Sequence, residues 1–431
     1  MSYLLYVNWK PAYALILLGV TVVTFILAKQ IQVSRCKKKI VVGGAILTLL
    51  PLLIFKYYNF INDSIFELLS SVGLRFHLSG LNWAIPMGIS FFTFQALGYL
   101  FDVYYKRITA EKDFLTYSLF ISFFPSIVAG PINKASLVIL QIKALRPYFD
   151  YGKAVEGLKM LLWGMFMKVV VADRLALYVD KVYSSYVNYS GVACFEASIL
   201  YSIQIYADFA GYSLMAIGVG KTLGFELTKN FRRPYFAVSV TDFWRRWHIS
   251  LSTWLKDYVY IPMGGSRCSK LRNYWNIFIT FLVSGIWHGA NWTFIIWGAI
   301  HGTCQIVEKA LGQQGCKYGI VGKTVKIAFT FLVINFAWIF FRSSSLDDAI
   351  CFIGRIFDFS LPTTLEPVAI IDIVFILWLF MADFLNEWRP GHGLFFESKY
   401  AVVRYSSYMM VLLMVMLSGI LSDSTFIYAV F

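Results

Sequence analysis

The chain has 431 residues, of which 58% are hydrophobic and only 14% are charged. Soluble domains carry about 25% charged residues, so this composition excludes an ordinary soluble protein and indicates a polytopic membrane protein. The formal net charge is +14, but the basic residues form short clusters between apolar runs rather than one long tract with interleaved aromatic residues. We therefore expect contacts with membrane lipids and no binding of nucleic acid.

Apolar runs of spanning length occur throughout the chain. The first, residues 11–28, predicts a retained transmembrane helix because no small-residue cleavage site follows it. A basic cluster in residues 29–39 then predicts that the N-terminus lies outside. In all we expect one integral membrane domain, residues 1–431, with about 10–11 transmembrane helices. The predicted spans are 11–28, 40–58, 83–103, 114–132, 155–172, 195–225, 274–300, 323–341, 366–384 and 402–421.

Two of these runs are interrupted by proline and glycine. Pro86 and Gly88 lie at the start of one run, and Pro125, Gly130 and Pro131 lie within the next. Such breaks free backbone groups that lipid cannot satisfy, so these segments should be packed inside the protein or line a cavity. The pattern predicts helices that enter the membrane partway and turn back.

Residues 229–272 are polar, aromatic and basic, and too charged to span a bilayer. Within this segment, residues 241–256 predict one interfacial helix, with Asp242 placed to pair with Arg246 four residues later. Large side chains repeat at three- and four-residue steps, and His248 lies on the same side. The predicted apolar face consists of Phe243, Trp244, Trp247, Leu251, Trp254 and Leu255.

His288 lies near the middle of residues 273–307, a stretch in which no Asp, Glu, Lys or Arg occurs. An ionisable group at membrane depth is costly, which favours a functional role. Imidazole exchanges protons near neutral pH, so His288 is the first candidate for chemistry and His248 the second. Gly285 and Gly289 flank His288 and allow close approach of another helix or of a substrate. His301 is expected at the membrane interface, and no role is assigned to it.

Asp208 is a carboxylate within an apolar run, so it is either neutralised by a basic partner or functional. Two partners are considered for it: an arginine of the interfacial segment, or an imidazole that the carboxylate orients. The arginines themselves suit phosphate binding, although contact with lipid headgroups explains them equally well. This basic group consists of Arg232, Arg233, Arg245 and Arg246.

The sequence indicates no metal site. Neither His248 nor His288 has a glutamate or cysteine at metal-ligand spacing, and the cysteines show no CxxC pair. We expect free thiols and no permanently bound cofactor. The six cysteines are Cys36, Cys194, Cys268, Cys304, Cys316 and Cys351.

Several motifs resemble those of the membrane-bound O-acyltransferase family, in its branch of bacterial polysaccharide O-acetyltransferases typified by the alginate O-acetylation protein. The resemblance covers a core of residues 86–342, in the family's order. The matching strings are PMGISFFTFQALGYLFDVYY (86–105), FFPSIVAGPI (123–132), IYADFAGYSLMAIG (205–218), NFRRPYFAVSVTDFWRRWHISLSTWLKDYVYIPMGGSR (230–267), SGIWHGANWTFIIWGAIHG (284–302) and FAWIFFR (336–342).

The resemblance implies a helical bundle with re-entrant and interfacial helices around a central funnel or tunnel in the bacterial cytoplasmic membrane. It implies transfer of an acyl group, expected to be acetyl from acetyl-CoA, toward an extracytoplasmic polysaccharide of the cell envelope. The route is either direct or through an extracytoplasmic partner acetyltransferase or acceptor protein. His288, in the WHG string, matches the family's catalytic histidine, and His248 matches its second motif histidine.

Other site residues follow from chemistry. The oxyanion formed during acyl transfer needs hydrogen-bond donors, and the candidates are His248, Asn291 and tryptophan indole groups such as that of Trp287. Asp208, Tyr212, Arg245 and Arg246 complete the supporting or substrate-binding candidates. One alternative within the same fold is D-alanyl transfer to teichoic acid from a carrier protein. An alternative from another class is a polysaccharide or lipid transporter in which His288 and Asp208 relay protons.

Overall fold

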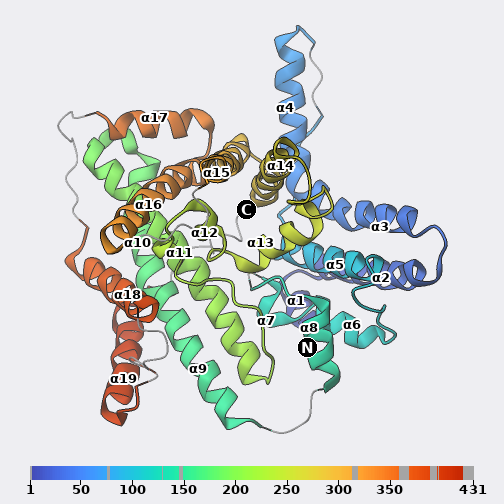
Figure 1. Cartoon of the computed structure of the whole chain (residues 1–431), viewed down its shortest axis with the longest axis horizontal. Coiled ribbons are helices and arrows are strands. Elements are labelled where there is room, and N and C mark those ends of the chain that lie inside the picture. The colour runs from blue at the N-terminus through green and yellow to red at the C-terminus, as the bar shows by residue number, and fades with distance from the viewer. Residues whose placement is uncertain are drawn as a thin grey trace. The chain divides into compact units, whose positions relative to one another are not determined.

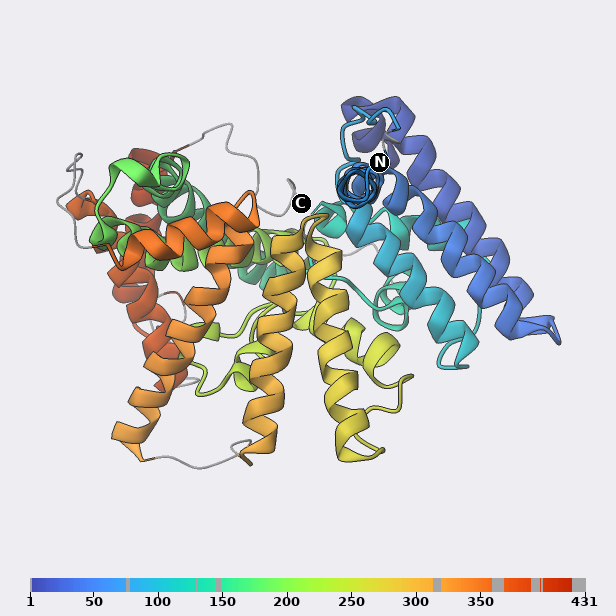
Figure 2. The same ribbon diagram turned by 90° about the horizontal axis from the view of Figure 1, so that it is seen from above.

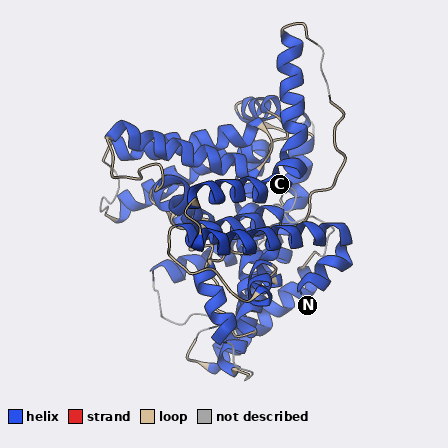
Figure 3. Ribbon diagram, turned by 90° about the vertical axis from the view of Figure 1, so that its right-hand side faces the viewer, coloured by secondary structure: helices blue, strands red, loops and turns tan. Residues whose placement is uncertain are grey.

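The computed structural model describes most of the chain. Within the described ranges every regular element is a helix and no strand occurs, as Figure 3 shows. This confirms the predicted all-α polytopic fold. His77, His392 and Cys316 lie outside the described residues. The described residues are 2–74, 78–128, 130–144, 149–312, 319–358, 368–388, 396 and 398–420.

The chain divides into two compact units, which are described separately. The prediction of one integral membrane domain stays a prediction. The first unit comprises Met1–Tyr151 and Leu223–Thr228, and the second comprises Gly152–Thr222 and Lys229–Phe431.

In the first unit, three helices named α2, α3 and α5 pack side by side (Figure 1). Helix α3 continues through a π-helical turn, η1, into α4, so that residues 37–71 are continuously helical, although α4 runs in a different direction from α3 (Figure 1). Helix α5 is buried along almost its whole length. The helices of this unit are α1 (Ser2–Trp9), α2 (Pro11–Val33), α3 (Lys37–Leu52), η1 (Leu53–Tyr57), α4 (Tyr58–Ser71), α5 (Ile89–Tyr104), α6 (Phe114–Ile121), α7 (Phe124–Ile127) and α8 (Ala135–Ala144).

The predicted breaks at proline and glycine are confirmed in this unit. Helix α5 begins only after Gly88, whose φ of 73° lies in the left-handed region that glycine adopts without strain. Tyr13 of α2 donates a hydrogen bond of 2.5 Å to the carbonyl of Ala84, so the protein itself satisfies backbone that lipid would leave unpaired. The second interrupted run forms two short helices, α6 and α7.

The second unit is built around α11, which contacts α10, α16 and α17 (Figure 1). Helices α14 and α15 form an antiparallel hairpin joined by residues 289–291, and Figure 2 shows them lying side by side. The helices of this unit are α9 (Tyr151–Met165), η2 (Phe166–Ala172), α10 (Asp173–Ser184), η3 (Tyr186–Asn188), α11 (Gly191–Thr222), η4 (Pro234–Phe236), α12 (Val240–Trp244), α13 (Ile249–Leu255), η5 (Lys256–Tyr260), α14 (Lys270–His288), α15 (Trp292–Ala310), α16 (Ile320–Arg342), α17 (Leu346–Ile356), α18 (Ile370–Trp388) and α19 (Ala401–Ser418).

Four helices of the described residues are long and apolar enough to cross a membrane, which is fewer than the predicted count. They are Pro11–Val33, Lys37–Ser71, Ile320–Arg342 and Ala401–Ser418. One other predicted span is divided in the structure, since residues 114–132 form α6 and α7, whereas residues 155–172 continue through the π-helical segment η2 into α10. A window of average hydropathy does not detect such divisions, because the residues on both sides of a break are apolar.

Candidate functional site

The fold brings His248 and His288 together, although they are 40 residues apart in the sequence. Both side chains are buried, with exposed fractions of 0% and 2%, and their ring centroids are 6.4 Å apart. His288 is the last residue of α14, and His248 directly precedes α13. The prediction that both histidines face inward is confirmed, whereas their catalytic roles stay predictions.

Aromatic side chains surround the two imidazoles. The Trp287 ring lies 5.8 Å from that of His248 and 4.8 Å from that of His288. Phe209 of α11 packs edge-on against His248 at 4.7 Å, and Trp297 packs edge-on against His288 at 5.0 Å. Burial in this shell lowers the pKa of His248 to about 3, so its imidazole is neutral at physiological pH.

His301 belongs to the same cluster, which corrects the expectation of an interface residue. Its side chain is fully buried, and its Nδ1 accepts a hydrogen bond of 3.2 Å from the Trp244 indole. The Trp297 ring lies between the two histidines of the hairpin, 5.0 Å from His288 and 4.8 Å from His301. The spacing of Trp297 and His301, one helical turn apart, is the signal that identifies this contact in the sequence.

The helices of the α14–α15 hairpin approach each other closely at glycine. A Cβ atom at Gly285 would collide with the carbonyl oxygen of Phe294, and one at Gly298 would collide with that of Phe281. Gly285 lies one turn before His288. The glycine beside His288 therefore admits a neighbouring helix, which is one of the two uses predicted for it.

The predicted continuous helix over residues 241–256 is wrong. Helix α12 ends at Trp244, and α13 begins only at Ile249, after His248 adopts a left-handed conformation with φ of 41° and ψ of 55°. The physical reason is tertiary hydrogen bonding, because the Ile249 amide donates to the carbonyl of Asn230 at 2.9 Å. The burial of the predicted apolar face is nevertheless confirmed for all six members, namely Phe243, Trp244, Trp247, Leu251, Trp254 and Leu255.

Asp208 forms an ion pair with Lys168 and not with an arginine of the interfacial segment. Its carboxylate lies 2.6 Å from the ammonium of Lys168 in η2, which also lies 2.8 Å from Asp173. Asp208 has an exposed fraction of only 1%, so this pair neutralises a buried charge. Tyr212 follows one turn later on α11 and is partly buried.

The basic residues of the second unit divide into two groups. Arg246 forms ion pairs with Asp242 at 3.1 Å, as predicted, and with Glu387 of α18 at 2.9 Å. Arg233 also pairs with Glu387, at 3.0 Å. These two arginines connect the segments on either side of α12 to α18, and the expectation that they bind phosphate stays a prediction. Arg245 is instead exposed and lines a cavity.

Asn291 caps the start of α15. Its Oδ1 accepts a hydrogen bond of 3.0 Å from the Thr293 amide, and its Nδ2 donates one of 2.7 Å to the carbonyl of Ser344. Both polar groups of the side chain thus stabilise the fold. The expectation that Asn291 donates to the oxyanion stays a prediction.

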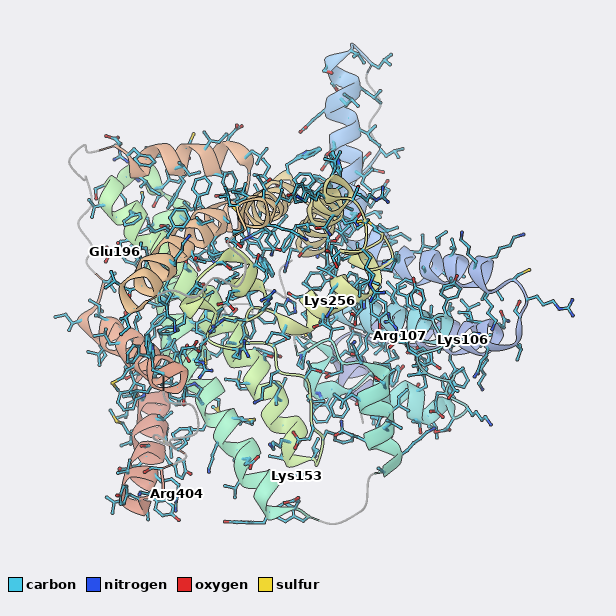
Figure 4. The ribbon with its side chains drawn as sticks, in the orientation of Figure 1. Lys106, Arg107, Lys153, Glu196, Lys256 and Arg404 are labelled. Atoms are coloured by element: carbon cyan, nitrogen blue, oxygen red, sulfur yellow. The ribbon has the colours of Figure 1, made fainter. Side chains whose placement is uncertain are left out.

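A cavity of about 430 Å³ lies within the second unit. Ile249, which follows His248, and Ser284, one turn before His288, both line it. Neither histidine is itself a lining residue. Lys256, labelled in Figure 4 next to α13, adds positive charge to the wall. The wall combines apolar side chains, Trp244, Ile249, Leu255, Ile277 and Phe281, with three basic ones, Arg245, Lys256 and Lys309.

Metal chemistry receives no support from the part of the chain that the structure describes. There, no group of three or more His, Cys, Asp or Glu side chains is arranged to hold a metal ion. Five cysteines are described, and all are free thiols, namely Cys36, Cys194, Cys268, Cys304 and Cys351.

Comparison with known proteins places these residues in a family. A sequence model of the membrane-bound O-acyltransferase family matches residues 45–346, a range that contains both clustered histidines and extends beyond the predicted core of 86–342. The chain is 38% identical over 353 residues to the "Probable alginate O-acetylase AlgI" of Pseudomonas aeruginosa, covering 81% of this chain and 66% of that protein. It is 36% identical over 378 residues to the "Peptidoglycan O-acetyltransferase" of Helicobacter pylori, covering 81% of this chain and 71% of the relative.

A more distant relative is the "Teichoic acid D-alanyltransferase" of Bacillus subtilis, at 24% identity over 307 residues, covering 69% of this chain and 75% of the relative. The chain thus spans slightly less than two thirds of the Pseudomonas protein and somewhat more of the others. The family match covers well over half of the chain and includes helices of both units. This chain belongs to the membrane-bound O-acyltransferase family.

Proposed function

We propose that this protein is a bacterial membrane O-acyltransferase in which His288 is the general base. The observation that carries the proposal is the burial of His248 and His288 side by side, 6.4 Å between ring centroids, within the region that matches the family. A hydroxyl group is a poor nucleophile at neutral pH. A base within hydrogen-bond reach of it contributes roughly 10²–10⁴-fold to the rate.

The proposed reaction balances without a further reactant. The acceptor hydroxyl oxygen forms a bond to the thioester carbonyl carbon, and the carbon–sulfur bond breaks. His288 takes the hydroxyl proton and returns it to the departing thiolate, so that the products are an ester and a free thiol. We assign His248 to stabilise the charge that develops on the carbonyl oxygen, because a neutral imidazole carries one N–H donor. The aromatic shell would also keep water from hydrolysing the acyl group.

We propose acetyl-CoA as the donor. In the cavity next to the histidines, Arg245, Lys256 and Lys309 are available to bind the phosphate groups of the donor. The apolar wall of the cavity would contact the narrow chain that carries the thioester. Relatives named for O-acetylation are 36–38% identical to this chain, whereas the relative named for D-alanyl transfer is 24% identical. This difference favours acetyl over D-alanyl transfer.

The proposed acceptor is a hydroxyl of an extracytoplasmic polysaccharide, reached directly or through a partner acetyltransferase outside the membrane. Names of the relatives support this substrate class, since they refer to alginate and peptidoglycan. We further propose that the protein lies in the cytoplasmic membrane with its N-terminus outside, as the basic cluster in residues 29–39 indicates.

Purified protein in detergent tests the proposal. The assay measures thiol release from acetyl-CoA and transfer of labelled acetyl to alginate oligosaccharides, with an aminoacyl carrier protein as the alternative donor. We expect wild-type protein and the exposed-residue control Glu67→Gln to consume acetyl-CoA, and His288→Ala to lose at least 10²-fold in rate.

Acetylation of the exported polymer is measured in parallel, in cells that express equal amounts of wild-type protein and His288→Ala. Full acetylation by His288→Ala would refute the assigned base. Turnover of the aminoacyl carrier alone would refute the acetyl donor and support D-alanyl transfer. Polymer export that depends on the protein, with no thioester consumed, would instead support a transporter.

A further inference from the structure

The backbone at His248 is strained, and nothing in its local sequence explains why. With φ of 41° and ψ of 55°, His248 adopts a left-handed conformation that residues with a Cβ atom rarely take. Residues 240–256 contain neither glycine nor proline, so the turn between α12 and α13 is imposed from outside this segment. Strained residues held in this way concentrate at functional sites.

The segment that starts at Asn230 imposes the turn. The carbonyl of Asn230 accepts the Ile249 amide at 2.9 Å, and its side-chain Oδ1 accepts the Ser250 amide at 3.2 Å. On the other side of the turn, the Arg232 amide donates to the carbonyl of Arg246 at 2.9 Å. These hydrogen bonds fix the backbone just before and just after His248.

The Asn230 side chain is suited to this contact in a way that an apolar residue is not. The side chain is 1% exposed. Amides in the first turn of a helix have no acceptor within the helix, and the Asn230 Oδ1 accepts the hydrogen bond of one of them, the Ser250 amide. Next to it, Phe231 packs against Phe209 and Trp247, each at 5.0 Å between ring centroids. The segment that holds the turn, Asn230 and Phe231, therefore packs against the same aromatic shell that surrounds His248.

We infer that Asn230 is a positioning residue of the acyl-transfer site: it holds His248 in the left-handed turn that directs its imidazole toward His288. This inference rests on the proposed function. Asn230 acts through His248 rather than on the substrate. Its loss should misplace the imidazole, and a displacement of about 1 Å at a catalytic centre costs on the order of 10²-fold in rate.

The test compares Asn230→Ala with a matched control, Asn335→Ala. Asn335 of α16 is also buried, and its side chain is also hydrogen-bonded, because it accepts from Ser202 at 2.7 Å and donates to Ser198 at 3.0 Å. We expect both variants to lose thermal stability. Only Asn230→Ala should lose kcat by 10-fold or more, with KM for acetyl-CoA changed by less than about 3-fold. Asn230→Asp, which keeps the Oδ1 acceptor, should recover most of the lost kcat.

Equal losses of kcat in Asn230→Ala and Asn335→Ala would overturn the inference. It would also be overturned if Asn230→Asp folds but is no more active than Asn230→Ala. A second measurement needs no activity. Glycine adopts the left-handed conformation freely, so in a His248→Gly background Asn230→Ala should lower the melting temperature less than in the wild type. An equal decrease in both backgrounds would also overturn it. The His288→Ala variant separates the proposed function from the role of Asn230. Full activity of His288→Ala would refute the proposed function. An inactive His288→Ala together with a fully active Asn230→Ala would refute only the role of Asn230.

Discussion

Replacing Lys168 by methionine should destabilise the second unit strongly. The Lys168 ammonium lies 2.6 Å from Asp208 and 2.8 Å from Asp173, and the exposed fractions of the two carboxylates are only 1% and 5%. Methionine fills a similar volume but carries no charge, so two buried carboxylates would lose the cation that they share. Breaking a buried pair from one side costs roughly 3–5 kcal/mol, because the remaining charge is uncompensated. This corresponds to roughly a 10²–10⁴-fold shift of the unfolding equilibrium.

Thermal unfolding of purified variants in one detergent measures this effect. Because the cost arises from carboxylates that have lost their shared cation, removing these carboxylates in turn should restore stability in steps. Lys168→Met should be the least stable, addition of Asp208→Asn should recover part of the loss, and further addition of Asp173→Asn should recover most of it. If each added substitution instead lowers stability further, the charge argument is refuted and the three side chains act independently.

The same series tests what Asp208 does. If the role of Asp208 is purely structural, acyl-transfer activity should be proportional to the fraction of folded protein in every variant of the series. Loss of activity in a stable triple variant would instead assign Asp208 a direct part in the reaction, as the sequence analysis considered.

Three further results are expected. Because burial lowers the pKa of His248 to about 3 while the unfolded value is about 6.5, the unfolded state takes up a proton first as the pH falls. Protonation of His248 in the unfolded state should therefore lower the free energy of unfolding by about 2 kcal/mol between pH 7 and pH 5. The variant His248→Gln should not show this decrease when its melting is measured against pH. Glu308→Ala should lower the free energy of unfolding by roughly 1–3 kcal/mol, since its carboxylate accepts the Thr241 amide at 2.9 Å, and calorimetry should show Glu308→Gln to be milder. Lys256→Ala and Arg245→Ala should each raise KM for acetyl-CoA and leave kcat within about 3-fold of the wild-type value. In both variants KM should depend less on salt concentration than it does in the wild type.

The sequence predicted the parts of the site that depend on local pattern. Three- and four-residue spacing correctly identified Trp244, Trp247 and His248 as buried, although the single helix assumed for that spacing ends at Trp244. Proline and glycine correctly marked the start of α5 after Gly88. The Asp242–Arg246 pair also follows from spacing alone. These features depend on residues within one or two helical turns of each other, and a pattern reports such neighbours directly.

What the sequence did not predict depends on contacts between distant segments. Lys168 neutralises Asp208 from a different helix, 40 residues earlier in the chain, and no spacing rule connects them. His301 was assigned to the interface because it lies at the end of an apolar run, yet α15 carries it into the core beside Trp244. In both cases a polar residue was classified by its sequence neighbours, whereas its environment is set by another element.

The two histidines are held by different physical means. His288 ends α14, and its position follows from the tight contact of α14 with α15 at Gly285. His248 lies in a turn held by a few hydrogen bonds from Asn230 and Arg232. Closely packed helices have essentially one arrangement, whereas a strained turn relaxes when a single hydrogen bond is lost. Substitutions around α13 should therefore misplace His248 while the protein stays folded, and substitutions at the hairpin that misplace His288 should also unfold it.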